Sequence, residues 1–496
     1  MIWWQNIPFF LVWTPLLFAS VTAVLKPRAA RCMILLFPGL CAVFGAILAL
    51  YTARTGASFT YAMGVFGAPF GNELRAGPAE ALLATAFSVI MLLSVLGGWN
   101  RMGVQIPPRR MSLYCVMVML LLSAMMAEVF TNDMFTAYVF IEIMTIAACS
   151  LIVARTRGRT LFAATKYMIF NLLGSGLFLL GLSILYCMTG HLLMDSLHDS
   201  VSELFRRGEH MDSLTLSLAL ITVGLAVKSA LYPFHSWLPD AYASCTPASS
   251  AMLSSLISKT YIFLYVKFVV RVVGLENLAA THIQTLLLLC AVASILMGSV
   301  DAIMEKKLRR MIAYSSVAQI GYIYLGIAAC TPVGVAAALF HMIAHALAKA
   351  LLFLTGDRLI GASDGDAHFH ELRGAGFRAP VCGAAFTVGS LSIVGVPLLA
   401  GFAGKLYLCR ACLGMGPRRA ALSLVALAAS TALNAAYFII TIVTLYRTPP
   451  HDYAVKMRHH WYSNAALAAC AALIVLMGLM GGRIYALIDM GVRALG

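Results

Sequence analysis

The chain alternates long apolar runs with short polar segments from end to end. About 14 of these runs reach roughly 20 residues, the length at which an α-helix crosses the hydrocarbon core of a bilayer. They lie near residues 7–25, 33–52, 80–98, 113–130, 134–154, 168–188, 214–232, 248–272, 282–300, 311–329, 333–355, 380–408, 421–445 and 463–482. Open strands and long loops cannot satisfy their backbone groups in lipid, and the short alternating segments of a barrel are missing. The pattern predicts an all-α integral membrane protein.

Composition supports this prediction and excludes a water-soluble fold. Hydrophobic residues make up 61% of the chain and charged residues only 11%, against roughly 25% charged in soluble domains. The first run, Ile7 to Leu25, lacks a basic leader and an Ala-x-Ala site, so we expect it to be retained rather than cleaved as a signal peptide. Cys409 and Cys412 form a lone CxxC without the second pair that a metal site needs, so we expect neither a bound metal nor a cofactor.

The net charge of +15 has a topological meaning in such a chain. Loops that follow odd-numbered runs hold about 20 Lys and Arg residues, against about 8 on the other side. Basic loops stay in the cytoplasm, so both termini are expected outside a multi-pass protein of the inner (plasma) membrane.

A few ionisable residues remain inside the apolar runs. Each costs at least about 2.5 to 3.5 kcal/mol near the bilayer centre, so such residues are functional candidates. The lysines are Lys228, Lys259, Lys267, Lys349 and Lys405. Lys259 stands among serines and threonines that can hydrate a path, whereas Lys267 is near a helix end beside Arg271 and is expected to extend to the headgroups.

Two of these lysines adjoin helix breaks in corresponding settings. Pro233 follows Lys228 by about one turn, and Pro397 precedes Lys405 within a glycine-rich stretch. Paired interrupted helices indicate inverted repeats with an ion path between them. The seventh and twelfth runs are five apart, which predicts repeats of five helices, runs 4–8 and 9–13.

Glu142 is the acid deep in the fifth run, and a buried ammonium is its natural partner. A close Glu142–Lys228 pair would hold the lysine charged, while separation would favour release of its proton. The pair is therefore a candidate switch, and a static ion pair that locks two helices is the alternative.

His341, His345 and Lys349 recur at every fourth residue, which places them on one face of the eleventh helix. A neutral imidazole accepts a proton at one nitrogen and donates at the other, as a relay requires. Hydrogen bonding between helices is the alternative, and a zinc site is disfavoured because the HExxH glutamate is missing. His368 and His370 are expected in a solvated cytoplasmic loop.

Several motifs together resemble the proton-conducting antiporter-like family, which comprises the A-type and D-type components of Mrp cation/proton antiporters, the complex I membrane-arm subunits and their hydrogenase equivalents. The motifs are Tyr-Val-Phe-x-Glu142, Lys228-x4-Pro-Phe-His-x-Trp-Leu-Pro, Ala313-Tyr-Ser-Ser-x2-Gln-x-Gly, His345-x3-Lys349 and Gly395-x-Pro-x3-Gly-Phe-x-Gly-Lys405. The match spans nearly the whole chain. A lysine at position 405 resembles the D-type Mrp component.

The resemblance implies 14 helices with helices 7 and 12 broken. It implies four regions: helices 1–3 in residues 1–112, the two half-channels in 113–272 and 273–447, and helix 14 in 448–496. It further implies Glu142 and Lys228 as the coupling pair, Lys259 as the bridge, His345 and Lys349 as the second relay, helped by His341, and Lys405 as the exit. The segment Phe66–Arg75 resembles the family's outer hairpin.

The leading hypothesis is a proton-translocating subunit of a multisubunit Mrp-type Na⁺(K⁺)/H⁺ antiporter, with other membrane subunits as partners. The alternative is the pump subunit of an NADH:quinone oxidoreductase or hydrogenase complex. In either case we expect no redox centre on this chain, because it has no Cys cluster, no CxxCH and no dinucleotide fingerprint. An autonomous solute transporter is a third hypothesis, less favoured because the buried charges form a chain instead of one site.

Overall fold

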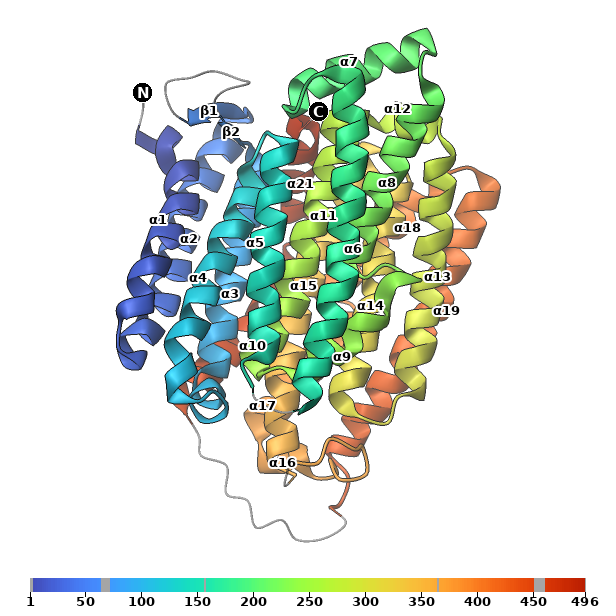
Figure 1. The fold of residues 1–496 in the computed structure, drawn as a ribbon. Coiled ribbons are helices and arrows are strands. Elements are labelled where there is room, and N and C mark those ends of the chain that lie inside the picture. The colour runs from blue at the N-terminus through green and yellow to red at the C-terminus, as the bar shows by residue number, and fades with distance from the viewer. Residues whose placement is uncertain (1–2, 64–71, 156–157, 364, 450–459, 496) are drawn as a thin grey trace.

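Long helices that run side by side form the body of the protein, and a short β-hairpin lies at one end (Figure 1). The computed structural model describes residues 3–63, 72–155, 158–363, 365–449 and 460–495. The N-terminal region comprises η1 (Trp3–Asn6), α1 (Ile7–Val24), α2 (Pro27–Thr55), β1 (Phe59–Met63), β2 (Asn72–Ala76) and α3 (Pro78–Gln105). The two strands pair antiparallel, and residues 66–71 of the predicted hairpin fall outside the described residues.

Two sets of helices of opposite direction follow. The first half comprises α4 (Pro108–Phe130), α5 (Met134–Val153), α6 (Gly158–Thr189), α7 (Met194–Arg207), α8 (Met211–Ser229), η2 (Phe234–Trp237), α9 (Leu238–Ser244), α10 (Pro247–Met252), η3 (Leu253–Ile257), α11 (Ser258–Lys267) and η4 (Phe268–Val273). The short α12 (Leu275–Ala279) leads to the second half. This half comprises α13 (His282–Met304), α14 (Leu308–Ala328), α15 (Pro332–Gly361), α16 (Ala375–Arg378), α17 (Pro380–Val394), α18 (Ala400–Leu413) and α19 (Pro417–Leu445). The chain continues through α20 (Trp461–Leu479) and α21 (Gly481–Leu495).

The membrane spans agree with the predicted topology. Among the described residues, 12 helical segments are long and apolar enough to cross a bilayer. Two further crossings are interrupted, one from α10 to η4 and one through α17 and α18. The prediction of an all-α membrane fold with helices 7 and 12 broken is confirmed: the first break follows Ser229 within the Met211–Ser244 span, and the second separates α17 from α18. The strands β1 and β2 lie in the region of the predicted outer hairpin.

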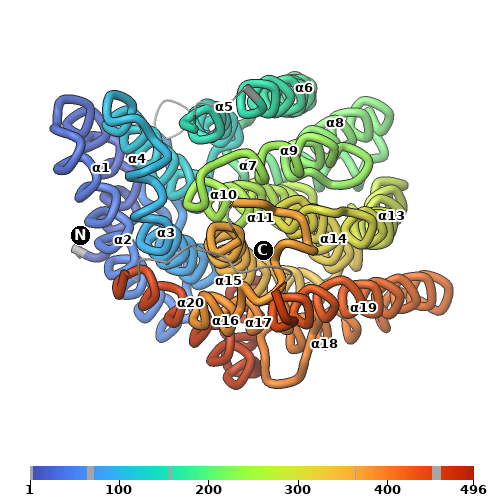
Figure 2. Tube along the Cα trace, turned by 90° about the horizontal axis from the view of Figure 1, so that it is seen from below, coloured from blue at the N-terminus to red at the C-terminus, as the bar shows by residue number. Residues whose placement is uncertain are grey.

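Both chain ends, the β-hairpin and α7 lie at the same end of the bundle, here called the terminal face, while α9 and α16 lie at the opposite face (Figure 1). α4, the first helix of the first half, begins at the opposite face, whereas α13, the first helix of the second half, begins at the terminal face. The two halves therefore run in opposite directions. Viewed along the bundle, α15 lies in the middle and α1 and α2 at one edge (Figure 2). The most apolar window of α15 is 100% buried, against 33% for α2. The buried centre therefore lies where the two halves meet.

The structure adds two features that the sequence did not predict. Residues after the fourteenth predicted run form a further helix, because α21 packs on α3 and α15 and Ala494 O accepts a hydrogen bond from Arg75. The run at 248–272 is not a uniform α-helix, because η3 and η4 are π-helical. Single π-turns are rare, leave carbonyls without their usual partners and occur mostly at functional sites.

Candidate functional site

Lys228 lies at the end of α8 with its side chain fully buried beside Glu142 from α5. Its Nζ donates a hydrogen bond to Thr145 Oγ1 at 2.9 Å and lies 3.7 Å from Glu142 Oε1. Glu142 accepts a hydrogen bond from Ser175, and the ring of Tyr261 lies 5.2 Å from the ammonium. The acid and the lysine paired in the sequence analysis are therefore brought together.

The backbone changes course directly after this lysine. α8 ends at Ser229, four residues before Pro233, and Ala230 adopts the left-handed conformation with φ of 62°. The indole of Trp237 donates a hydrogen bond to Val227 O at 3.2 Å. Val227 O, in the last turn of α8, thus accepts from this indole and also from the backbone N–H of Ala230 at 3.2 Å.

Two glycines allow α6 and α8 to approach each other beside Lys228. A Cβ atom on Gly174 would lie 2.8 Å from Gly224 O and 3.0 Å from Cγ of Lys228. A Cβ atom on Gly224 would in return lie 2.6 Å from Gly174 O. Small residues at such contacts let membrane helices pack backbone to backbone.

Lys259 lies between the two halves. Its Nζ donates a hydrogen bond of 2.5 Å to Ser254 O within the π-helical η3. η3 and α11, which carry Ser254 and Lys259, pack against α15 of the second half. The π-turn therefore supplies the acceptor for a lysine that faces the second half.

α15 carries the predicted relay residues in one row. His341 Nε2 lies 2.9 Å from Gln319 Oε1, and the rings of His341 and His345 are near parallel with centroids 6.4 Å apart. Both ring nitrogens of His345 are buried without a hydrogen-bond partner among the described residues. Lys349 Nζ donates to Ile312 O at 2.7 Å and also to a serine hydroxyl of α14. The unprotonated ring nitrogen of a neutral His345 can therefore accept a proton.

Lys405 of α18 occupies a setting that matches that of Lys228. Its Nζ donates to Val394 O at 3.0 Å, a carbonyl at the break between α17 and α18, and to Thr431 Oγ1 at 3.1 Å. The ring of Tyr322 lies 5.2 Å from the ammonium. Each lysine at a helix break thus has one threonine hydroxyl and one tyrosine ring. The difference is a carboxylate, which of these two lysines only Lys228 has as an ion-pair partner in the described part of the chain.

The sequence-based prediction for Lys267 is wrong, and Glu128 was missed. Lys267 does not reach the headgroups, because its side chain is fully buried and bonds to backbone carbonyls of α4. Glu128, in the fourth run, is 1% exposed. Glu128 could have been identified from the sequence, because it is an acid within a predicted apolar run.

The polar partners of the lysines could not be identified from the sequence. Thr145, Tyr261, Tyr322 and Thr431 are ordinary membrane-helix residues until the fold aligns them. Only their distances from Nζ distinguish them.

A cavity of about 890 Å³ lies at the opposite face, between the two halves. It is lined by charged side chains that include Arg101, Lys307, Arg309, Asp357 and His368. Asp357 pairs with Arg101 at 2.8 Å and with Arg309 at 3.5 Å. These charges make this mouth of the bundle polar.

Metal-binding geometry is not found in the part of the chain that the structure describes. No group of three or more His, Cys, Asp or Glu side chains converges there. In the loop after α15, His368 instead pairs with Asp366 at 2.7 Å and His370 with Glu371 at 3.1 Å. The side chains of both histidines are 40% or more exposed, as expected of a solvated loop.

Comparison with known proteins shows the family of the chain. A family model described as "NADH:quinone oxidoreductase/Mrp antiporter, TM" matches residues 131–431. The chain belongs to this family. The matched range contains both broken helices and every predicted path residue from Glu142 to Lys405.

Relatives from both branches of the family are similar to this chain. NADH-quinone oxidoreductase subunit N of Desulforudis audaxviator (strain MP104C) is 33% identical over 408 residues, covering 81% of this chain and 78% of the relative. The D component of the Na(+)/H(+) antiporter of Bacillus subtilis (strain 168) is 30% identical over 346 residues, covering 70% of this chain and 68% of the relative. A chain of the membrane-bound sulfane sulfur reductase, an archaeal respiratory membrane complex, superposes with a TM-score of 0.87 at 26% identity, covering 99% and 98%. The predicted family is confirmed, and this chain is an antiporter-like membrane subunit.

Proposed function

We propose that this chain translocates protons as a subunit of a multisubunit Mrp-type Na⁺(K⁺)/H⁺ antiporter. The observation that carries the proposal is the pair of lysines at helix breaks, Lys228 and Lys405, in matched settings. Interrupted helices in corresponding positions of two inverted halves are typical of ion paths in transporters. Buried lysines, histidines and a glutamate connect the two positions.

In the proposed path, protons from the opposite face reach Lys228, pass Lys259, cross to His345 and Lys349 and leave beside Lys405. The terminal face is then the outer side of the plasma membrane, in line with the basic loops at the opposite face. The residue ranges 113–272 and 273–447 are the two half-channels.

The driving step is a change in the 3.7 Å contact between Glu142 and Lys228. While the contact holds, the carboxylate stabilises the ammonium. When the contact opens, the carboxylate no longer stabilises the Lys228 ammonium. Lys228 then passes its proton to Lys259 once Lys259 is neutral, because two neighbouring positive charges disfavour one another.

A redox-driven complex is the second candidate for the host. It is supported by the similarity to the oxidoreductase subunit N of Desulforudis audaxviator at 33% identity. Electrons would then travel on partner subunits. Co-purification distinguishes the two hosts: small membrane subunits alone support the Mrp type, and partners with iron–sulfur centres support the redox type.

The test uses the assembled complex, purified through this chain and reconstituted in liposomes with an internal pH dye. Lys228→Ala and Glu142→Ala should each reduce proton flux by about tenfold or more, since each removes a group that lowers the barrier. Arg206→Ala is the matched control, because the Arg206 side chain is 76% exposed on α7 and pairs with Glu203 of the same helix. Flux equal to the wild type in both path variants would contradict the proposal.

A further inference from the structure

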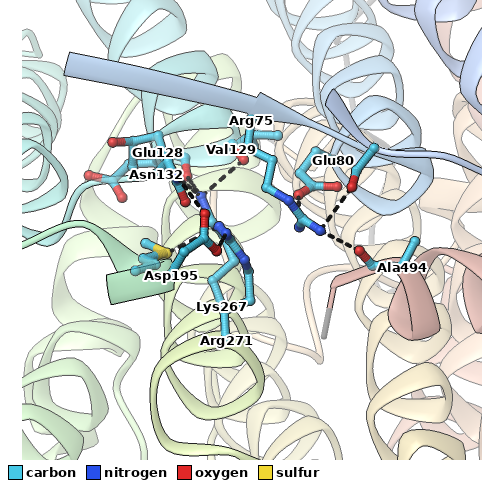
Figure 3. A network of polar contacts seen from close by, with 12 residues as sticks. Arg75, Glu80, Glu128, Val129, Asn132, Asp195, Lys267, Arg271 and Ala494 are labelled. Atoms are coloured by element: carbon cyan, nitrogen blue, oxygen red, sulfur yellow. Dashed lines mark hydrogen bonds and ion pairs between the residues drawn. The ribbon is translucent and has the colours of Figure 1, made fainter. Parts of the chain in front are cut away.

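A second group of buried charges lies at the terminal end of the first half, away from the proposed path (Figure 3). Glu128 on α4 is 1% exposed, Lys267 on α11 is 0% exposed and Arg271 on η4 is 4% exposed. Beside them lies Asn132, whose side-chain amide donates to the carboxylates of Glu73 and Asp195. Glu80 on α3 is 1% exposed, pairs with Arg75 at 3.3 Å and belongs to the same network. Ionisable groups held this deeply call for a function or a compensating contact.

The ammonium of Lys267 is held by the carbonyls at the end of α4. Its Nζ donates to Glu128 O at 3.2 Å, to Val129 O at 3.3 Å and to Thr131 O. The last carbonyls of a helix have no partner within the helix and form the negative end of its dipole. All three acceptors are uncharged, and no carboxylate forms an ion pair with Lys267 among the described residues.

Glu128 adjoins Lys267, because its own backbone oxygen accepts one of the three hydrogen bonds of the ammonium. Both carboxyl oxygens of Glu128 are buried without a hydrogen-bond partner among the described residues. An ionised carboxylate without donors is costly, so the neutral acid fits this conformation better. Glu128 is thus a buried acid directly beside the cation at the terminal end of the first half.

Solvent approaches the other side of this cation. Arg271, one helical turn beyond Lys267, donates to Asp195, whose side chain is 62% exposed. Partial burial raises the pKa of the Asp195 carboxyl, but the charge of Arg271 and hydrogen bonds from Asn132 and Arg271 bring that pKa below its ordinary value. A cavity of about 160 Å³ at the terminal face is lined by Asp195, His198 and Arg271. Arg271, which lines this cavity, is one helical turn from Lys267, whose ammonium bonds to Glu128 O.

We propose that Lys267, backed by Arg271, is an electrostatic seal that closes the first half toward the terminal face, with Glu128 as the proton-exchanging acid directly behind it. Fixed cations in a narrow, poorly hydrated passage raise the barrier for any further positive charge, including a proton. The seal would force protons on Lys228 to continue through Lys259 into the second half. This inference rests on the proposed proton conduction and assigns what directs it.

The experiment opens the seal where the normal exit is blocked. Lys405→Met in the reconstituted complex should reduce flux, and adding Lys267→Gln should restore a leak about tenfold above that single variant. Glutamine keeps N–H donors for the α4 carbonyls but removes the charge, so the fold is supported. Adding Glu128→Gln to the double variant should abolish the leak again. Lys267→Arg, which keeps the charge, should stay closed.

Each other outcome has a definite meaning. A Lys405→Met/Lys267→Gln complex that assembles and conducts no faster than Lys405→Met alone would overturn the seal. A leak that survives Glu128→Gln would overturn the role of Glu128. If Lys267→Gln does not assemble, the same comparison with Arg271→Gln, which weakens the seal from the solvent side, decides the matter. Failure of the proposed function is read separately, from wild-type flux in Lys228→Ala.

Discussion

Buried ammonium groups in this protein are held mainly by neutral dipoles. Lys259 bonds to a backbone carbonyl, and Lys349 and Lys405 each bond to one carbonyl and one hydroxyl. Carbonyls and hydroxyls stabilise an ammonium without fixing its proton as firmly as an ionised carboxylate does. Lys228 differs because Glu142 stands beside it, which makes this residue the point of control.

The threonine hydroxyls offer a matched test of this arrangement. Thr145→Val and Thr431→Val each remove one hydrogen bond to a lysine, worth about 1.5 to 3 kcal/mol to a charged group. We expect both variants to assemble and to show reduced proton flux in liposomes. Thr165→Val is the control, because Thr165 is exposed and its hydroxyl donates to Leu161 O of its own helix. A normal flux in both path variants would mean that the hydroxyls do not contribute.

Glu305, after the end of α13, gives a pH-dependent contribution to stability. Its carboxylate accepts hydrogen bonds from Arg310 Nε at 2.8 Å and from the backbone N–H of Lys306 at 2.9 Å. Partial burial raises the pKa of Glu305, but these hydrogen bonds and the Arg310 charge lower it by more. The pKa of Glu305 therefore lies below its ordinary value of 4.5. A depressed carboxyl pKa stabilises the folded state above the ordinary value and loses this effect as pH falls through the folded one.

Glu305→Gln should therefore lower stability by about 1 kcal/mol at neutral pH, a value reduced for solvent screening. The difference from the wild type should fade below pH 4.5. Thermal unfolding of the detergent-solubilised wild type and variant, at neutral pH and below pH 4.5, measures this difference in stability. A constant difference across this range would assign the effect to something other than the carboxylate charge.

At the scale of residues, the sequence identified the charges and the Glu142–Lys228 pair, but not the neutral partners of the lysines. Lys228, Lys259, Lys349 and Lys405 stand out because lysine is costly in an apolar run. Lys267 was misjudged because the free carbonyls at the end of α4 that hold it belong to a distant helix. Such a contact depends on tertiary packing.

Helix interruptions organise the site at the next scale. An interruption lies next to each of three buried lysines. These are the end of α8 beside Lys228, η3 beside Lys259 and the end of α17 beside Lys405. Proline and glycine indicated two of these breaks in the sequence, although α8 ends at Ser229, ahead of Pro233. The π-turn at η3 was not predicted, since no residue type there marks it.

Close approach of α6 and α8 gives a prediction with an internal control. Gly174→Ala would place a Cβ atom 2.8 Å from Gly224 O and 3.0 Å from the side chain of Lys228. Gly176, two residues along the same helix, has open space at that position. Overpacking costs about 1 to 3 kcal/mol, so Gly174→Ala should lower thermal stability and proton flux. Gly176→Ala should behave like the wild type, and equal behaviour of the two would contradict the close packing.

At the scale of the whole molecule, two inverted halves give the chain a direction. Hydropathy alone predicted the helix count, because an apolar run of sufficient length has few alternatives in lipid. The placement of α21 against α3 and α15 could not be predicted, since its alternation of polar and apolar residues also suits a helix lying on the membrane surface.

Orientation is open to a direct check. Arg206 on α7 is exposed at the terminal face, and Lys306 is exposed at the opposite face. The variants Arg206→Cys and Lys306→Cys therefore report on the two faces separately. In a background without the native cysteines, an impermeant thiol reagent should label Arg206→Cys in intact cells. It should label Lys306→Cys only after the membrane is opened. The reverse result would invert the proposed topology and the direction of the path.

One property of the proposed path matters above the others: the two halves conduct protons in series through Lys259. Lys259→Met keeps the size and removes the proton-carrying group, and the residue lies 0% exposed between the halves. The decisive measurement is proton flux in liposomes that hold the assembled complex with this substitution. We predict a decrease of about tenfold or more with unchanged assembly, because the bridge between Lys228 and the α15 relay is lost. An assembled Lys259→Met complex that conducts protons at the wild-type rate would contradict conduction in series.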